Sequence, residues 1–165
     1  MKTRSINILI VSLLLLGMMA VMLIVLVEKA HDDFEGNITV TQNGETEKTL
    51  SVSGLKLNPT ESREYSVNLV CLASGKYTVK ADFEEKTDGG MKHFVNVTAS
   101  IDGKCVYEGT LFQLLDGKEF FEFETELYEK DPAVLTIKYE MPYHIGNEAQ
   151  GTFCDFYVHL SVKKK

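Results

Sequence analysis

The chain has 165 residues, a length typical of one domain of ordinary size. Its composition is 44% hydrophobic and 25% charged, with 3 prolines, which is close to the globular average and argues against a disordered linker protein. The formal net charge of −7 would repel phosphate backbones. We therefore expect no nucleic-acid partner.

An uncharged apolar run lies near the start of the chain. From Ile6 to Val27, 22 consecutive residues carry no charge. A helix of that length spans about 33 Å, which is enough to cross a bilayer core of about 30 Å. Lys2 and Arg4 precede the run, so this end should stay in the cytoplasm and the rest of the chain should lie outside.

The sequence therefore predicts a single-pass membrane protein in three parts. Residues 1–27 form a membrane anchor, residues 28–36 a polar spacer, and residues 37–165 an extracytoplasmic domain. The alternative is a signal peptide that is removed, which would leave a secreted domain. We prefer a retained anchor, because the apolar run is longer than the roughly 7–15 residues of signal peptides and Glu28 is a poor cleavage-site residue before Ala30.

Alternation of apolar and polar residues dominates the chain after residue 36. The clearest case is residues 121–127, where one face has Phe121, Phe123 and Leu127 and the other has glutamate at 122, 124 and 126. A strand sorts such residues onto one apolar and one acidic face, whereas a helix would scatter them around its circumference. Similar runs occur at 65–71, 77–83, 95–101, 135–141 and 156–162, and weaker ones at 38–41, 49–57 and 104–107.

Turn signals separate these runs. Asp102-Gly103 is typical of a two-residue hairpin turn, and only residues 110–115 could form a helical turn. Roughly eight or nine short strands with frequent turns predict an all-β fold, a β-sandwich, preceded by one N-terminal transmembrane helix.

Three segments resemble the TasA/camelysin family of exported bacterial surface and biofilm-matrix proteins. They are Leu55 to Val70 (LKLNPTESREYSVNLV), Ala73 to Lys118, and Leu135 to Lys164. The last segment is the most specific, because it has a strand, then Met141-Pro142, then GNEAQG at 146–151, then an alternating strand.

The resemblance implies a jelly-roll or immunoglobulin-like sandwich in the extracellular matrix of Gram-positive bacteria. Several members of the family form biofilm fibres, in which the N-terminal strand of each subunit completes the sheet of its neighbour. This sequence departs from the family pattern in three places. Thr60 follows Pro59 where glycine is usual, the chain ends in three lysines rather than Ala-x-Gln, and no Thr-x-Ala-x-Phe segment follows the apolar run.

These departures favour a membrane-attached relative over a freely secreted fibre subunit. We therefore expect a non-enzymatic cell-surface or matrix domain that associates with itself or with related fibre subunits by strand addition. The alternatives are a surface metallopeptidase of the camelysin type and an adhesion or receptor-like domain that binds sugar or protein.

The cysteines offer one candidate cross-link. Cys71 and Cys154 share the parity of the apolar faces of their strands, so in an exported sandwich they could form a disulfide between the sheets. The alternative is a pair of buried thiols that act as small apolar side chains. Cys105 is predicted to be a packed free thiol.

No pattern of catalytic or metal-binding residues is apparent. None of the four histidines, His31, His93, His144 and His159, lies within four residues of another, and neither an HExxH nor a Gly-x-Ser-x-Gly motif occurs. Alternate glutamates at 122–126 would lie about 7 Å apart, too far to bind one cation together. We expect no enzyme activity, no metal and no cofactor.

The loop between the last two predicted strands is the candidate contact surface. Gly146, Asn147, Glu148 and Gln150 could contact a partner subunit there. The alternative is a loop that is fixed by hydrogen bonds from its side chains to its own backbone.

Overall fold

The structure is a computed structural model that describes residues 36–40 and 45–165. The predicted membrane anchor at 1–27 lies outside the described residues, as do residues 28–35 of the spacer. Within the described part of the chain, no helix is both long enough and apolar enough to cross a membrane.

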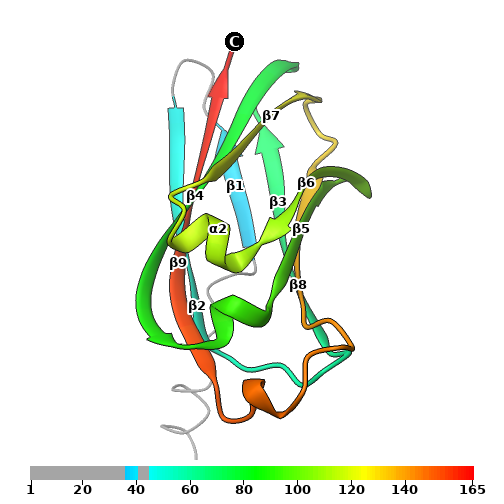
Figure 1. Cartoon of the computed structure of the whole chain (residues 1–165). Coiled ribbons are helices and arrows are strands. Elements are labelled where there is room, and N and C mark those ends of the chain that lie inside the picture. The colour runs from blue at the N-terminus through cyan, green and yellow to red at the C-terminus, as the bar shows by residue number, and fades with distance from the viewer. Residues whose placement is uncertain (1–35, 41–44) are drawn as a thin grey trace, which may run out of the picture. The chain divides into compact units, whose positions relative to one another are not determined.

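Strands make up most of the described residues (Figure 1). The strands are β1 (Gly36–Val40), β2 (Glu45–Leu55), β3 (Ser62–Cys71), β4 (Gly75–Gly89), β5 (Asn96–Ile101), β6 (Lys104–Thr110), β7 (Phe120–Leu127), β8 (Ala133–Glu140) and β9 (Phe153–Lys164). The short helices are η1 (Met91–Phe94), α2 (Leu111–Leu115) and η2 (Asn147–Ala149).

The strands form two sheets that face each other as a sandwich. One sheet, here called sheet A, has the order β1-β3-β8-β5-β6, and the other, sheet B, has the order β2-β9-β4-β7. From β2 to β9 this is the order of a jelly roll, with β1 added beside β3. The predicted all-β sandwich is therefore confirmed, and of the two topologies implied by the resemblance the strand order is that of the jelly roll.

Alternating side chains from both sheets fill the interior, as the period of two requires. In β8, Leu135, Ile137 and Tyr139 are completely buried, and the residues between them are more exposed. The rings of Tyr139 and Phe156, from opposite sheets, meet edge to face with centroids 5.5 Å apart. Burial of such side chains supplies most of the stability of the fold.

The predicted helical turn is α2, which connects β6 of sheet A to β7 of sheet B (Figure 1). A capping box starts it: the Gln113 backbone N–H donates to the Thr110 hydroxyl, and the Thr110 backbone N–H donates to the Gln113 side chain at 2.9 Å. Leu111, Leu114 and Leu115 are buried, so the helix closes part of the core between the sheets.

Candidate functional site: the β1 edge and the loop end of the sandwich

Strand β1 forms one edge of sheet A and runs parallel to β3. Its register pairs Gly36 with Val67 and Val40 with Cys71. The Asn68 amide donates to the Asn37 side-chain oxygen at 3.0 Å on the outer face, and the Leu72 N–H donates to the Val40 carbonyl at 3.3 Å. Among the described residues, β3 is the only strand hydrogen-bonded to β1.

Two side chains anchor β1 in the core. Ile38 is 2% exposed and Val40 is 0% exposed, while Asn37 and Thr39 point outward. Burial of an isoleucine or valine contributes about 1.5–3 kcal/mol each. The five-residue strand is thus held by its ladder to β3 and by a few kcal/mol of apolar burial.

The connection from β2 to β3 is a tight turn at one end of the sandwich. The Glu61 N–H donates to the Asn58 carbonyl at 2.9 Å, and Pro59 and Thr60 occupy the central positions. Thr60 has a φ of 72°, as the third residue of a type II turn requires, although it is β-branched. Both the Asn58 backbone N–H and its side-chain amide donate to the Glu61 carboxylate at 2.9 Å. These hydrogen bonds lower the pKa of Glu61.

The loop from β8 to β9 lies against this turn. The Thr60 N–H donates to the Met141 carbonyl, and the Met141 N–H donates to the Glu61 carbonyl, both at 3.0 Å. Further along the loop, η2 begins after Gly146, and hydrogen bonds from the backbone N–H groups of Glu148 and Gly146 lower the pKa of the Glu148 carboxyl. The Glu148 carboxylate is thus engaged by the backbone of its own loop.

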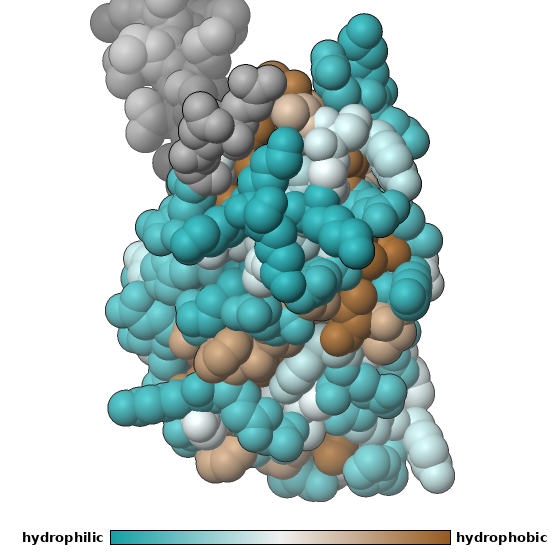
Figure 2. Space-filling view, turned by 90° about the horizontal axis from the view of Figure 1, so that it is seen from above, coloured by the Kyte–Doolittle hydropathy of each residue, from teal (hydrophilic) through white to brown (hydrophobic). Residues whose placement is uncertain are grey.

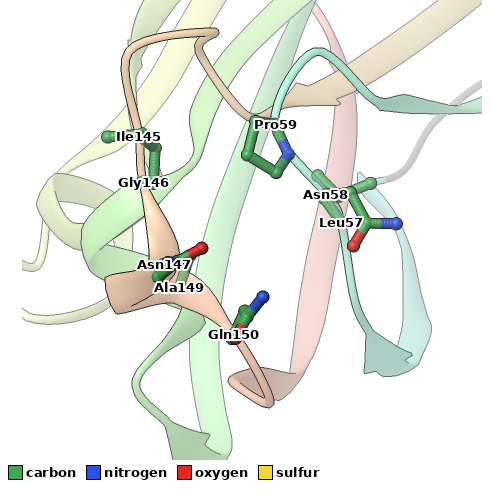
Figure 3. A pocket seen from close by; sticks show the side chains of 8 residues that line it. All are labelled: Leu57, Asn58, Pro59, Ile145, Gly146, Asn147, Ala149 and Gln150. Carbon is green, nitrogen blue, oxygen red and sulfur yellow. The ribbon is translucent and has the colours of Figure 1, made fainter.

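A pocket of about 220 Å³ lies between the turn and the loop (Figure 3). Buried Leu57 and Ala149 contribute apolar surface, as do Pro59 and Ile145. Three carboxamides complete the lining: Asn58 from the turn, and Asn147 and Gln150 from the loop. The predicted residues Gly146, Asn147 and Gln150 thus line one pocket, whereas Glu148 does not. The part played by the turn at Asn58 was not visible in the sequence, because the two segments lie far apart along the chain.

The opposite end of the sandwich, which carries the C-terminal lysines, is mainly hydrophilic where Figure 2 shows it. Two large apolar side chains, Leu72 and Tyr128, are 52% and 55% exposed in this part of the molecule. Apolar residues exposed singly on a polar surface are ordinary. We therefore place the candidate site at the loop end and at the β1 edge.

Of the two interpretations of Cys71 and Cys154, the structure contradicts the disulfide and has the pair of buried free thiols. Cys71 lies beside Tyr77, whose partner in β9 is Lys164. Cys154 lies ten residues earlier in β9, or about 33 Å along the strand, whereas a disulfide requires Cα atoms within about 7 Å. Burial raises the pKa of the Cys154 thiol to about 12. Cys105, predicted to be packed, is exposed on the edge strand β6.

One histidine has both ring nitrogens hydrogen-bonded on the outer face of sheet B. His159 Nδ1 lies 2.9 Å from the Thr49 hydroxyl, and its Nε2 lies 3.0 Å from the Glu84 carboxylate. The order carboxylate–imidazole–hydroxyl is that of a hydrolytic triad, but catalysis also needs oxyanion donors. The three side chains come from three neighbouring strands of sheet B, with Thr49 and Asp82 as the register partners of His159 in β2 and β4. The arrangement therefore holds three strands together.

The described residues contain no cluster of three metal-ligating side chains. The glutamates of β7 face lysines instead: Glu122 pairs in register with Lys80, and Glu126 with Lys76 of β4. Glu124 bonds to Lys165, which lowers the pKa of Glu124. The acidic face of β7 is thus a solvated face that neighbouring lysines partly neutralise.

A charged cluster that the sequence did not indicate lies beside η1. Lys92 is only 4% exposed, and its ammonium lies 2.8 Å from Asp116, 2.5 Å from Glu85 and 3.0 Å from Asp88. Burial opposes the charged form of Lys92, but the hydrogen bonds to the three carboxylates outweigh it and raise the pKa of Lys92. The cluster joins the bulged part of β4, η1 and the end of α2.

No protein-family model matches the chain, and no curated protein sequence matches it. A family 35 carbohydrate-binding module from Clostridium thermocellum has a TM-score of 0.40 at 8% identity, over 74% of this chain and 99% of the module. The sugar-binding C-terminal domain of EclA has a TM-score of 0.37 at 19% identity, over 66% of this chain and 81% of that domain. This chain spans 11% of a β-glucosidase from Paenibacillus barengoltzii, with 76% of this chain covered, a TM-score of 0.35 and 10% identity. Similarities this low carry no inference about function.

Proposed function

We propose that the protein is a non-enzymatic bacterial surface domain that associates with copies of itself, or with related fibre subunits, by exchange of β1. The observation that supports this is the position of β1. It is a five-residue edge strand that directly follows the N-terminal segment, and among the described strands it pairs with β3 alone. Its backbone supplies ladder hydrogen bonds, and Ile38 and Val40 supply specificity.

Exchange follows from the same contacts that hold β1 in its own sheet. When β1 leaves β3, it exposes backbone groups on β3 and the core sites of Ile38 and Val40. The β1 of a neighbour would satisfy both, at no net loss of contacts. Because the donated strand and the accepting edge are different surfaces, the association is head-to-tail and extends into a chain of subunits.

The predicted anchor at residues 1–27 would place this association at the cell membrane. A retained anchor would hold the domain on the outer face of the membrane and restrict where its own β1 can reach. An anchored subunit would still accept the β1 of a fibre subunit. The proposal is therefore a membrane-attached accessory that links a matrix fibre to the cell surface.

The full-length protein in detergent micelles tests the proposal by sedimentation velocity and negative-stain electron microscopy. We expect oligomers that lengthen with concentration, and their loss in Val40→Asp, which places a charge in the buried β1 site. Thr39→Asp, on the exposed face of the same strand, is the matched control and should still assemble. A protein that stays monomeric at all concentrations, or Val40→Asp that assembles normally with an unchanged circular dichroism spectrum, contradicts the proposal.

A further inference from the structure

We propose that the pocket between the β2–β3 turn and the β8–β9 loop binds one neutral sugar ring of a surface glycan. This goes beyond the proposed function, because exchange of β1 does not involve the pocket. The pocket draws on two segments about 90 residues apart in the chain, and hydrogen bonds between Thr60 and Met141 and between Met141 and Glu61 hold them together.

The lining of the pocket is uncharged, which favours a neutral ligand. None of the residues that line it is ionisable. Two acidic residues lie in the same segments, but their carboxylates are already bonded: Glu61 accepts from Asn58, and Glu148 accepts from the backbone of its own loop. A charged ligand would find no counter-charge in the lining, and its desolvation would be costly.

The free hydrogen-bonding groups of the pocket match a polyhydroxylated ligand. In the described structure, the side chains of Asn147 and Gln150 make no hydrogen bond to protein atoms, and the Asn58 amide nitrogen is used by Glu61 while its oxygen is free. Figure 3 shows Asn147 and Gln150 on the side of the loop that faces the turn. A carboxamide offers both donors and an acceptor, so each can bond to a pair of ring hydroxyls.

The remaining lining suits the C–H faces of a sugar ring. Leu57 and Ala149 are 6% and 5% exposed, and Pro59 and Ile145 add apolar surface around the polar groups.

The size and the rigidity of the pocket limit the ligand further. Its volume of about 220 Å³ is below the range of about 300–1,000 Å³ for drug-sized ligands, so it admits one ring rather than a chain. The turn at Pro59 is fixed by three hydrogen bonds between Asn58 and Glu61, so little conformational entropy is lost on binding.

The test is a titration of the full-length protein, in a detergent without a sugar headgroup, with the β-1,4-linked tetrasaccharides of glucose and of N-acetylglucosamine. Calorimetry measures the affinity, and NMR follows the side-chain amide signals of Asn147 and Gln150. We expect at least one saccharide to bind and to shift both signals. Asn147→Ala and Gln150→Ala should each weaken binding about tenfold, as the loss of one hydrogen bond predicts.

Thr136→Ala is the control, because it removes a polar side chain from the outer face of sheet A in β8, away from both the pocket and β1. It should bind with unchanged affinity. Absence of binding by both saccharides at about 10 mM overturns the inference, as does binding that Asn147→Ala and Gln150→Ala leave unchanged. Sedimentation of the same samples reports on association through β1 separately, so failure of one proposal is distinguishable from failure of the other.

Discussion

The ammonium group of Lys92 lies 2.8 Å from the carboxylate of Asp116, and this contact joins η1 to the end of α2. The same ammonium also bonds to Glu85 and Asp88 of β4. A single buried cation thus holds together three segments that have no backbone ladder in common. It also neutralises carboxylates that would otherwise repel each other.

Replacement of Lys92 by methionine should destabilise the domain by about 3 kcal/mol, because three carboxylates would remain close together without a counter-charge. Urea unfolding measures the loss. Lys138→Met is the control, since Lys138 pairs with Glu140 on the exposed face of sheet A. This substitution should lower the free energy of unfolding by less than about 1 kcal/mol. Equal effects of the two substitutions would contradict the assigned role of Lys92.

The same cluster predicts how stability depends on pH. The hydrogen bond from the Gly90 N–H, and then the bond to Lys92, lower the pKa of Asp88 below its ordinary value of 3.8. The contribution of Asp88 to the free energy of unfolding is therefore present above pH 3.8, and it is lost as the pH falls through the pKa of Asp88 in the folded state. The pKa of Lys92 is raised in the folded state. The contribution of Lys92 to the free energy of unfolding is therefore complete below its ordinary pKa of 10.5, and it is lost as the pH rises toward its pKa in the folded state.

Unfolding free energies measured across the pH range should thus show a plateau with an acid and an alkaline decline. In Lys92→Met the alkaline decline should become smaller, because the group that titrates there is absent. An alkaline decline of the same size in the variant would show that other groups cause it.

Thr60→Gly should stabilise the domain by about 1 kcal/mol. Thr60 has a φ of 72°, a conformation that is strained for a β-branched residue and free of strain for glycine. Thermal unfolding measures the change. Thr98→Gly, in the regular strand β5, is the control and should destabilise. A loss of stability in Thr60→Gly comparable to that in Thr98→Gly would argue against strain at Thr60.

Tyr139→Phe should be neutral or stabilise the domain by about 1 kcal/mol. The Tyr139 hydroxyl is completely buried and has no hydrogen-bond partner, and burial raises its pKa well above the usual range. Its removal relieves an unsatisfied polar group while the ring keeps its contacts. Tyr77→Phe should instead cost about 1 kcal/mol, because the Tyr77 hydroxyl donates to the Ala73 carbonyl at 2.5 Å. Chemical denaturation of both variants should therefore give opposite or clearly different effects.

Alternation along the chain predicted which residues form strands, because one face of each strand must be buried. Residues 135–141 and 156–162 are examples: Leu135 and Phe156 head alternating series that reach the core. The length of β4 was underestimated. It was expected at 77–83 but spans Gly75–Gly89, since its second half is exposed and carries a bulge between Glu85 and Thr87.

Alternation along a strand shows on which face of the sheet a side chain lies. It does not show how far along the sandwich that side chain lies relative to residues of other strands. This is why Cys71 and Cys154 were assigned correctly to the interior, while the choice between a disulfide and two free thiols stayed open until the structure showed free thiols. The cluster around Lys92 could not be predicted either, because its partners come close to Lys92 only when β4, η1 and α2 pack together. The loop at Gly146 was singled out either as a contact surface or as a loop fixed by its own side chains. Its neighbour across the pocket, Asn58, could not be predicted, because that depends on β2 and β8 ending at the same end of the sandwich.

The central claim, that β1 passes between subunits, is tested most directly by disulfide trapping. Asn37 and Asn68 are register partners on the outer face, with their side chains 3.0 Å apart. In a Cys105→Ser background, full-length Asn37→Cys is mixed with full-length Asn68→Cys and oxidised. Intact mass should reveal a disulfide-linked dimer between the two variants. A mixture of Asn37→Cys with Asn96→Cys, which lies in β5 away from β1, should give none. If the Asn37/Asn68 mixture stays monomeric, while a double variant that carries both cysteines forms the bond within one chain, β1 remains in its own subunit and the proposed function is contradicted.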